Sequence, residues 1–388
     1  MDAPNDTLSA GHSPVKVILW MVIWLLAIDI AINAGFDASR PWSSRVLGLT
    51  RYFNYGRSIE GKLADILGPA ADRPDPIVHA GWIDSRQWHD LPSKSTGNGD
   101  LSVAVYGQSF AFDAAKAMQE LDGQMTLRLI GGPAAPLSHS FAAYRADAPT
   151  RKVDVVVVGI LASSFARSGS ISALSWTFES PAPFTFPRFS FDHGTLTEVD
   201  PRFTTEQDFR AAFRDKGEVW RQFKEQLKTY DKGYSALVFN ESMFDHSALV
   251  RLMRRGWASS LRQYDSEEKE SDGSPRYDQA QAQIAVELLR RLQQLTSAAG
   301  ERLVVVLLHD RGFDRSLYRA LGRPLAELNI PYVSTHEFFS SRDPGQFISD
   351  GHFIEPANRA VARALLHTIR STVRNGEDDA SDKSKFTD

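Results

Sequence analysis

The sequence of 388 residues contains no cysteine. A disulfide framework and a thiolate zinc site are therefore excluded, and the absence fits an exported protein that avoids mispaired thiols. Strong basic character is also missing, because 48 acidic residues outnumber 44 lysines and arginines and leave a formal net charge of −4. This balance argues against nucleic acid as the main partner.

Several functional motifs are missing as well. The sequence has no His-Glu-x-x-His zinc motif, no phosphate-binding glycine-rich loop, no dinucleotide fingerprint and no internal repeat. We therefore expect neither a metal nor another cofactor. What the chain does have is length and 42% hydrophobic residues, enough for one large α/β domain with additions.

Only one long apolar run is present, and it lies near the N-terminus. After a short tail of residues 1–16, residues 17–28 are uncharged, and the run continues through Asp29 to Phe36. This is about the twenty residues that cross a bilayer. No Ala-x-Ala-like cleavage site follows, so residues 17–36 are predicted to be an uncleaved signal anchor. A buried core helix is the alternative.

The charges around this segment do not decide its orientation. Lys16 precedes the segment, whereas Arg40, Arg45 and Arg51 follow it, which favours a cytoplasmic main domain. Long domains, however, translocate largely regardless of such charges. Asp29 lies in the last third of the segment, where it either reaches the interface or contacts a partner membrane protein, such as an acyl-transferring one.

A buried strand followed by a serine is the first catalytic signal. Residues 101–107 form an apolar run that ends at Gly107, and Gln108, Ser109 and a helical pattern from Ala111 follow. Such a turn places a hydroxyl at a helix N-terminus, where backbone N–H groups stabilise an oxyanion. Ser109 is the candidate nucleophile, and a simple helix-capping serine is the alternative.

The second signal lies near the C-terminus, where Asp350-Gly351-His352 precedes a predicted helix over residues 356–373. A carboxylate beside an imidazole fixes its tautomer and stabilises the imidazolium, while the imidazole takes the serine proton. An aspartate that stabilises a turn beside an incidental histidine is the alternative.

Together the two segments resemble the SGNH (GDSL-type) hydrolase superfamily. Gly107-Gln108-Ser109-Phe110 resembles the Gly-Asp-Ser-Phe block of the alginate O-acetylation proteins, and Asp350-Gly351-His352-Phe353 resembles their Asp-x-His-aromatic block. The resemblance implies a three-layer α/β/α, flavodoxin-like parallel sheet and an acyl-serine mechanism. It also implies a polysaccharide acceptor, a catalytic domain on the periplasmic side of the inner membrane, and an acyl donor or a membrane acyltransferase as a partner.

The oxyanion donors are predicted less directly. Gly132 follows a strand over residues 126–130, and its backbone N–H, with that of Ser109, suits an oxyanion hole. The family's third donor is the asparagine of a Gly-x-Asn block, but here Gly159-Ile160-Leu161 has leucine at that position. Ser163, or its neighbour Ser164, is the candidate substitute.

The element order predicts the domain organisation. A membrane-proximal segment (37–99) precedes an SGNH-like domain (101–374) with an insertion at about residues 165–275, and an unstructured tail (375–388) follows. Further strands are predicted at 153–159, 234–239, 302–308 and 330–334, and helices at 57–67, 205–230, 246–263, 277–298 and 315–328. The charged residues 265–275 are predicted to be a solvated loop.

The insertion is rich in aromatic residues, among them Trp176, Phe184 and Phe186. Such side chains either stack on sugar rings at a site rim or pack a long loop onto the domain.

The sequence therefore predicts a membrane-anchored serine O-acetyltransferase or esterase that modifies an extracytoplasmic polysaccharide. Retention of all three triad residue types favours this enzyme. The missing asparagine favours the alternative, a catalytically silent scaffold or glycan-binding component that has the same fold.

Overall fold

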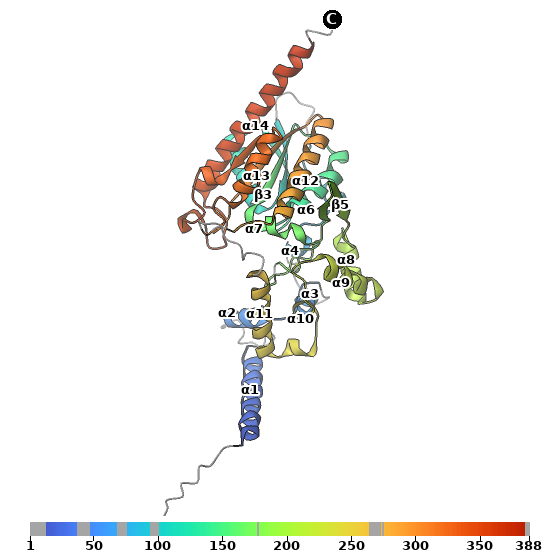
Figure 1. Ribbon diagram of the computed structural model, residues 1–388, viewed down its shortest axis with the longest axis vertical. Coiled ribbons are helices and arrows are strands. Elements are labelled where there is room, and N and C mark those ends of the chain that lie inside the picture. Colours follow the sequence, from blue (N-terminus) through green and yellow to red (C-terminus); the bar gives the residue numbers. More distant parts are fainter. Residues whose placement is uncertain are drawn as a thin grey trace, which may run out of the picture. The chain divides into compact units, whose positions relative to one another are not determined.

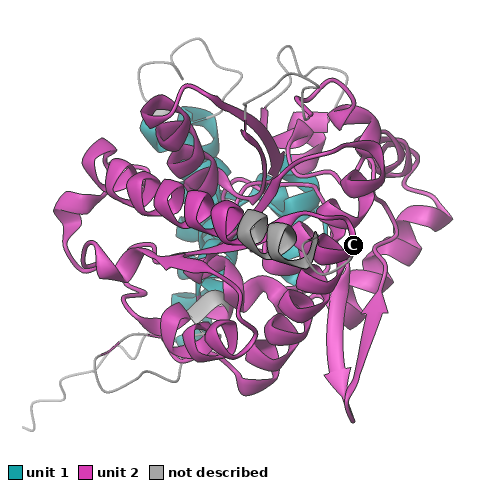
Figure 2. Cartoon of the chain, turned by 90° about the horizontal axis from the view of Figure 1, so that it is seen from above, with its two compact units in different colours: residues 1–62, 236–259 teal, residues 63–235, 260–388 magenta. Residues whose placement is uncertain are grey.

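The computed structural model describes residues 13–36, 47–67, 76–93, 101–176, 178–263, 273 and 275–384. The chain divides into two units (Figure 2): unit 1 comprises residues 1–62 and 236–259, and unit 2 comprises residues 63–235 and 260–388. The predicted N-terminal tail as far as residue 12, the loop at 94–100, most of the charged loop at 265–275 and the last four residues lie outside the described residues.

Unit 2 is built on a five-stranded parallel sheet in the order β2-β1-β3-β6-β7. Its strands are β1 (Leu101–Gly107), β2 (Met125–Gly131), β3 (Val155–Leu161), β6 (Arg302–Leu308) and β7 (Tyr332–Ser334). This order confirms the predicted flavodoxin-like arrangement. The second strand is added on one side of β1 and all later strands on the other side, so the order of strand addition reverses between β1 and β3. Parallel sheets of this kind place their sites at the carboxyl ends of the strands.

Helices cover both faces of the sheet (Figure 1). Val103 and Val105 of β1 belong to the core beneath α5 (Ser109–Leu121) and α14 (Glu355–Ser384). Ala104 and Tyr106 belong to the opposite core, beneath α6 (Leu137–Asp147), α12 (Gln279–Ala298) and α13 (Ser316–Glu327). Because β1 is buried on both faces, its residues read as a nearly continuous apolar run in the sequence.

The insertion contains a β-hairpin that the sequence did not predict. The strands β4 (Arg188–Asp192) and β5 (Thr195–Val199) pair antiparallel, and Phe189 and Leu196 pack into the core beneath α6 and α12. The turn residues His193 and Gly194 both have positive φ, at 46° and 80°. Two such residues between strands match the right-handed strand twist, which is why this turn closes a two-residue hairpin.

Three predicted elements differ in the structure. The helix predicted over 205–230 is divided into α8 (Glu206–Asp215) and α9 (Glu218–Tyr230), because Lys216 takes the left-handed conformation with φ 53°. The strand predicted over 234–239 is a single helical turn, α10 (Ala236–Phe239). The helix α14 continues to Ser384, through residues predicted to lack structure; the stretch contains no proline, which would have ended the helix.

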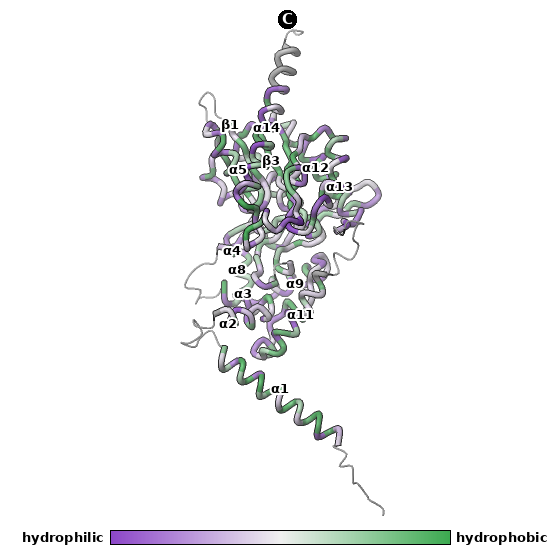
Figure 3. Tube along the Cα trace, turned by 90° about the vertical axis from the view of Figure 1, so that its left-hand side faces the viewer, coloured by the Kyte–Doolittle hydropathy of each residue, from purple (hydrophilic) through white to green (hydrophobic). Residues whose placement is uncertain are grey.

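Unit 1 contains the N-terminal helix α1 (Pro14–Phe36), with α2 (Leu47–Asn54), the start of α3 (Ile59–Leu67), α10, and most of α11 (Ala248–Gln263). Over its 23 residues α1 has no buried side chain, and it is hydrophobic along most of its length (Figure 3). Among the described residues, α1 alone is long and apolar enough to cross a membrane. The short helices α4 (Pro76–His79) and α7 (Ala162–Phe165) belong to unit 2.

Candidate active site

The start of α5 lies directly against the carboxyl ends of β1 and β3. A Cβ atom at Gly159 would lie 2.4 Å from the Cβ of Ala111, and one at Gly107 would lie 3.2 Å from the same atom. Glycine at these strand ends therefore lets the first turn of α5 approach the sheet more closely than any other residue would allow. Ser109, the first residue of α5, is held at this edge.

Gln108 fixes the turn between β1 and α5. Its side chain is completely buried. With the amide oriented so that both ends are satisfied, Gln108 donates to the carbonyl oxygen of Gly159 and accepts from the N–H of Leu161, each at 3.1 Å. A carboxylate in this position could only accept. Glutamine at this position thus fits the backbone of β3, a role that the sequence did not indicate.

Ser109, His352 and Asp350 form a continuous chain of hydrogen bonds. The Oγ of Ser109 lies 2.6 Å from Nε2 of His352, and Nδ1 of His352 lies 3.0 Å from Oδ1 of Asp350. The same carboxylate oxygen accepts the backbone N–H of His352 at 3.0 Å. The structure thus brings Ser109 together with two residues that lie more than 240 positions later in the sequence.

The imidazole ring of His352 is also held by packing. Phe110 stacks on it with ring centroids 4.7 Å apart and an angle of 22° between the planes. Phe353 in turn packs edge-on against Phe110 at 4.9 Å. The sequence contains both phenylalanines in its two specific blocks, yet their role in orienting the ring becomes visible only when the blocks meet.

The electrostatics of the site follow from these hydrogen bonds. The backbone N–H and the ring of His352 hold the pKa of the Asp350 carboxyl below its ordinary value. Asp350 is therefore ionised at neutral pH and can accept the Nδ1 proton of His352. Its side chain is 61% exposed, so solvent weakens its attraction for an imidazolium.

The three predicted oxyanion donors are arranged differently from one another. The N–H of Ser109 belongs to the first turn of α5 and has no intrahelical partner. The N–H of Gly132 donates to the carbonyl oxygen of Gly107 at 3.3 Å. The N–H of Ser163 donates to Oδ1 of Asp310 at 3.0 Å. In this structure only the first of the three N–H groups is available to an oxyanion.

Asp310 is a residue of this edge that sequence reasoning missed. It follows β6, and burial raises the pKa of its carboxyl, an effect that hydrogen bonds from Ser163 oppose. The available signal was its position just after a buried strand, where α/β folds collect polar residues.

Gly132 is enclosed rather than open. A Cβ atom there would lie 2.7 Å from the Cα of Gly81 and 3.1 Å from the ring of Phe184. Gly81 itself has φ +87°, and its carbonyl oxygen accepts a hydrogen bond from Nε2 of His139 at 2.7 Å. Burial lowers the pKa of His139 to about 4, so this histidine is a neutral structural residue beside the edge.

The aromatic residues predicted to bind sugar are in the interior, which corrects that prediction. Phe184 and Phe186 are 0% and 1% exposed, and Trp176 is 8% exposed. Phe184 and Phe186 pack against His139 with ring centroids 5.4 and 6.4 Å apart, while the indole N–H of Trp176 donates to Ser170. The insertion uses these rings to attach itself to the domain, because large aromatic surfaces gain most from burial.

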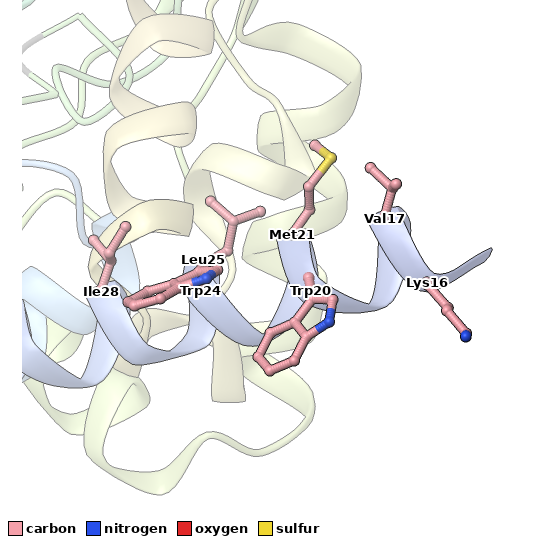
Figure 4. A pocket seen from close by; sticks show the side chains of 7 residues that line it. All are labelled: Lys16, Val17, Trp20, Met21, Trp24, Leu25 and Ile28. Atoms are coloured by element: carbon pink, nitrogen blue, oxygen red, sulfur yellow. The ribbon is translucent and has the colours of Figure 1, made fainter. Parts of the chain in front are cut away.

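Two hollows among the described residues lie away from the triad. One of about 580 Å³ runs along α1 and is lined by Lys16 and apolar side chains of that helix (Figure 4). Another of about 250 Å³ lies at the opposite edge of the sheet, beside Glu301 and Asn329. Within the described residues, no group of three or more His, Asp or Glu side chains is disposed to hold a metal.

Comparisons with known proteins add little beyond this geometry. No family model matches the chain, and no curated protein matches its sequence. Among solved structures, it is similar to a putative acylhydrolase from Bacteroides fragilis, with a TM-score of 0.38 and 9% sequence identity over 74% of this chain and 95% of that chain. The interpretation of the site therefore rests on the residues that form it.

Proposed function

We propose that the protein is a serine esterase or O-acyltransferase that works through an acyl-serine intermediate. The observation that carries the proposal is the 2.6 Å contact between Ser109 Oγ and His352 Nε2, with Asp350 at the other ring nitrogen. A hydroxyl, a base and an orienting carboxylate in this order are the groups that nucleophilic acyl transfer requires.

The reaction divides into two steps. Nε2 of His352 takes the proton of Ser109 as Oγ attacks the ester carbonyl, and the backbone N–H of Ser109 is the donor proposed for the oxygen that becomes negative. His352 then gives the proton to the departing alcohol, and an acyl-serine remains. In the second step water or a sugar hydroxyl attacks the acyl-serine while His352 takes its proton. His352 then returns the proton to Ser109 Oγ, and a free acid or a new ester is released.

For the substrate we propose an acetyl group and an extracytoplasmic polysaccharide, with α1 as a membrane anchor and the triad on the periplasmic side. The support is the likeness of the two sequence blocks to the alginate O-acetylation proteins, together with the length and apolar character of α1. Because Trp176, Phe184 and Phe186 are buried, no aromatic platform supports the glycan part of this proposal.

Intact-mass measurement tests the chemistry. Full-length protein incubated with an activated acetyl ester is expected to gain one acetyl group, and Ser109→Ala is expected to gain none. Ser297→Ala is the matched control, because Ser297 is exposed on α12. Equal acetylation of the wild type and Ser109→Ala would contradict the proposal. Faster loss of the adduct when an exopolysaccharide oligomer is added would identify a transferase.

The second candidate is a catalytically silent scaffold or glycan-binding component. It is favoured by a specific observation, namely that the N–H groups of Gly132 and Ser163 are already engaged with Gly107 and Asp310. Losing one oxyanion donor costs about 10²- to 10³-fold in rate. This candidate predicts oligomer binding without any acyl adduct on Ser109.

A further inference from the structure

Unit 1 buries charge at its centre. The guanidinium of Arg254 is 1% exposed and pairs with the carboxylate of Asp245, which is 4% exposed. Arg254 also donates to the carbonyl oxygens of Leu237 at 2.8 Å and Gly56 at 3.3 Å, and Asp245 accepts the backbone N–H of Ser58 at 3.2 Å. Burying an ion pair costs several kcal/mol in desolvation, so it persists only with such extra hydrogen bonds.

The outside of unit 1 carries many large apolar side chains. Apart from α1, seven large apolar or aromatic side chains are between 45% and 78% exposed: Leu49, Tyr52, Leu237, Met243, Phe244, Met253 and Trp257. The helix α11 shows this most directly. Its Arg254 is buried with Ala248 and Ala258, whereas Met253 and Trp257 are exposed. A helix that faces water usually buries its large apolar side chains and exposes its arginines.

This apolar outside is connected to the membrane helix. Oδ1 of Asp29 in α1 accepts two hydrogen bonds, one from the hydroxyl of Ser247 at 3.0 Å and one from the backbone N–H of Leu249 at 2.9 Å. The first turn of α11 is thus attached to α1 seven residues before Phe36, the last residue of α1, or about 10 Å along the helix axis. Figure 1 shows α11 beside this end of α1.

Asp29 therefore has a partner within its own chain. The sequence left two interpretations of this carboxylate open, contact with the interface or contact with another membrane protein. The structure adds a third, in which Asp29 satisfies two donors at the start of α11 and so fixes the level of α11 relative to the bilayer.

We propose that unit 1 is a module embedded in the membrane interface, and that its exposed apolar side chains lie in the headgroup and outer acyl region of the bilayer that α1 spans. Lipid is favoured over a protein partner by the side chains that accompany the apolar ones. The guanidinium of Arg255 lies over the rings of Tyr52 and Tyr55, 4.6 and 5.5 Å from their centroids. Arginine, tyrosine and tryptophan prefer the headgroup level, where they meet phosphate and the polar–apolar boundary.

The cysteine-free chain allows a direct test. Met253→Cys and Phe244→Cys, each labelled with an environment-sensitive fluorophore, are reconstituted as full-length protein into vesicles of phosphatidylcholine and phosphatidylglycerol. Both probes are expected to be quenched by a spin label on the lipid chains and to be protected severalfold from aqueous iodide, compared with the same protein in detergent. Arg323→Cys is the control, because that side chain is 88% exposed on α13 of unit 2.

The outcomes separate lipid from other occupants. Iodide quenching at positions 253 and 244 equal to that at position 323 would overturn the proposal. Protection that appears only in native membranes, and not in vesicles, would assign the surface to a membrane protein and would overturn it too. Using two positions guards against a poorly folding variant. The proposal rests on the anchoring of α1, which co-flotation with the vesicles checks separately, and it holds whether or not Ser109 is catalytic.

Discussion

The two units of this protein differ in where their large apolar side chains lie. In unit 2 large apolar side chains fill the core on both faces of the sheet, beside a buried ion-pair network of Arg128, Asp147, Arg151 and Glu301. The large apolar residues that are exposed there, such as Leu121, Val219 and Leu295, lie singly on different helices. In unit 1 an ion pair is buried and methionines and aromatic rings are exposed. The contrast teaches that one chain can bury its large apolar side chains in one unit and expose them in the other, which is the arrangement expected if unit 1 meets lipid as proposed.

The largest effect is expected at the triad of unit 2. Ser109→Ala and His352→Ala should each lower turnover of a small acetyl ester by about 10³-fold or more, because the triad acts as a unit. The double variant should lose little beyond either single one, whereas Asp350→Asn, which alters a largely exposed group, should retain measurable activity. Steady-state kinetics measure this, and additive losses would mean that Ser109 and His352 do not share one mechanism.

The next largest effect is expected at the buried ion pair of unit 1. Arg254→Ala leaves the Asp245 carboxylate buried without its cation, which should cost about 3–5 kcal/mol in the free energy of unfolding of this unit. Limited proteolysis within residues 236–259 measures the loss, and ester turnover should be retained because the triad lies in unit 2. Arg255→Ala is the neighbouring control. Equal protease resistance in the two variants would show that the polar interior is not what holds unit 1 together.

Two large apolar residues test the contrast directly. Phe184→Ala removes a fully buried ring that lies against Gly81 and Gly132, and it should lower the free energy of unfolding by about 3–5 kcal/mol. Met253→Ala removes a side chain that is 73% exposed, and in detergent it should change stability by less than about 0.5 kcal/mol. Denaturant titration compares the two variants. Similar losses in the free energy of unfolding would show that the buried and the exposed apolar residues do not differ in their contribution to stability.

The last effect is a pH dependence of unit 2, which is small for each step in pH but accumulates over the acid range. Burial lowers the pKa of His139 to about 4 and that of His309 to about 3, so the folded state keeps both neutral below pH 6.5 while the unfolded chain takes up protons. Stability should therefore fall as the pH decreases from about 6.5 to about 4, with each histidine contributing up to about 1.4 kcal/mol per pH unit.

Thermal unfolding between pH 7 and pH 5 measures this slope. His139→Phe keeps an aromatic ring beside Phe184 and Phe186 but removes one titrating group, so its melting temperature should depend less steeply on pH. If the melting temperature of the variant depends on pH as steeply as that of the wild type, His139 takes up a proton in the folded protein as readily as in the unfolded chain.

Much of the site was predictable from the sequence because its signals are local. Gly107 and Ser109 are neighbours, as are Asp350 and His352, and buried strands such as β1 and β6 read as apolar runs that end where the strands end. The hairpin β4–β5 was missed although Asp192-His193-Gly194 has a turn-like composition. The division between α8 and α9 was missed because nothing in the apolar spacing marks the positive φ of Lys216.

The sequence by itself determined the parallel α/β fold, the three triad residue types and a helix long enough to span a membrane, because each depends on short-range order along the chain. Only the tertiary structure decided that the aromatic residues of the insertion are interior, that Gly132 and Ser163 donate elsewhere, and which face of α11 is covered. Apolar periodicity reveals that a helix has two faces. Which of the two faces is covered by protein depends on distant segments, such as those that bring Asp29 and Gly56 against α11.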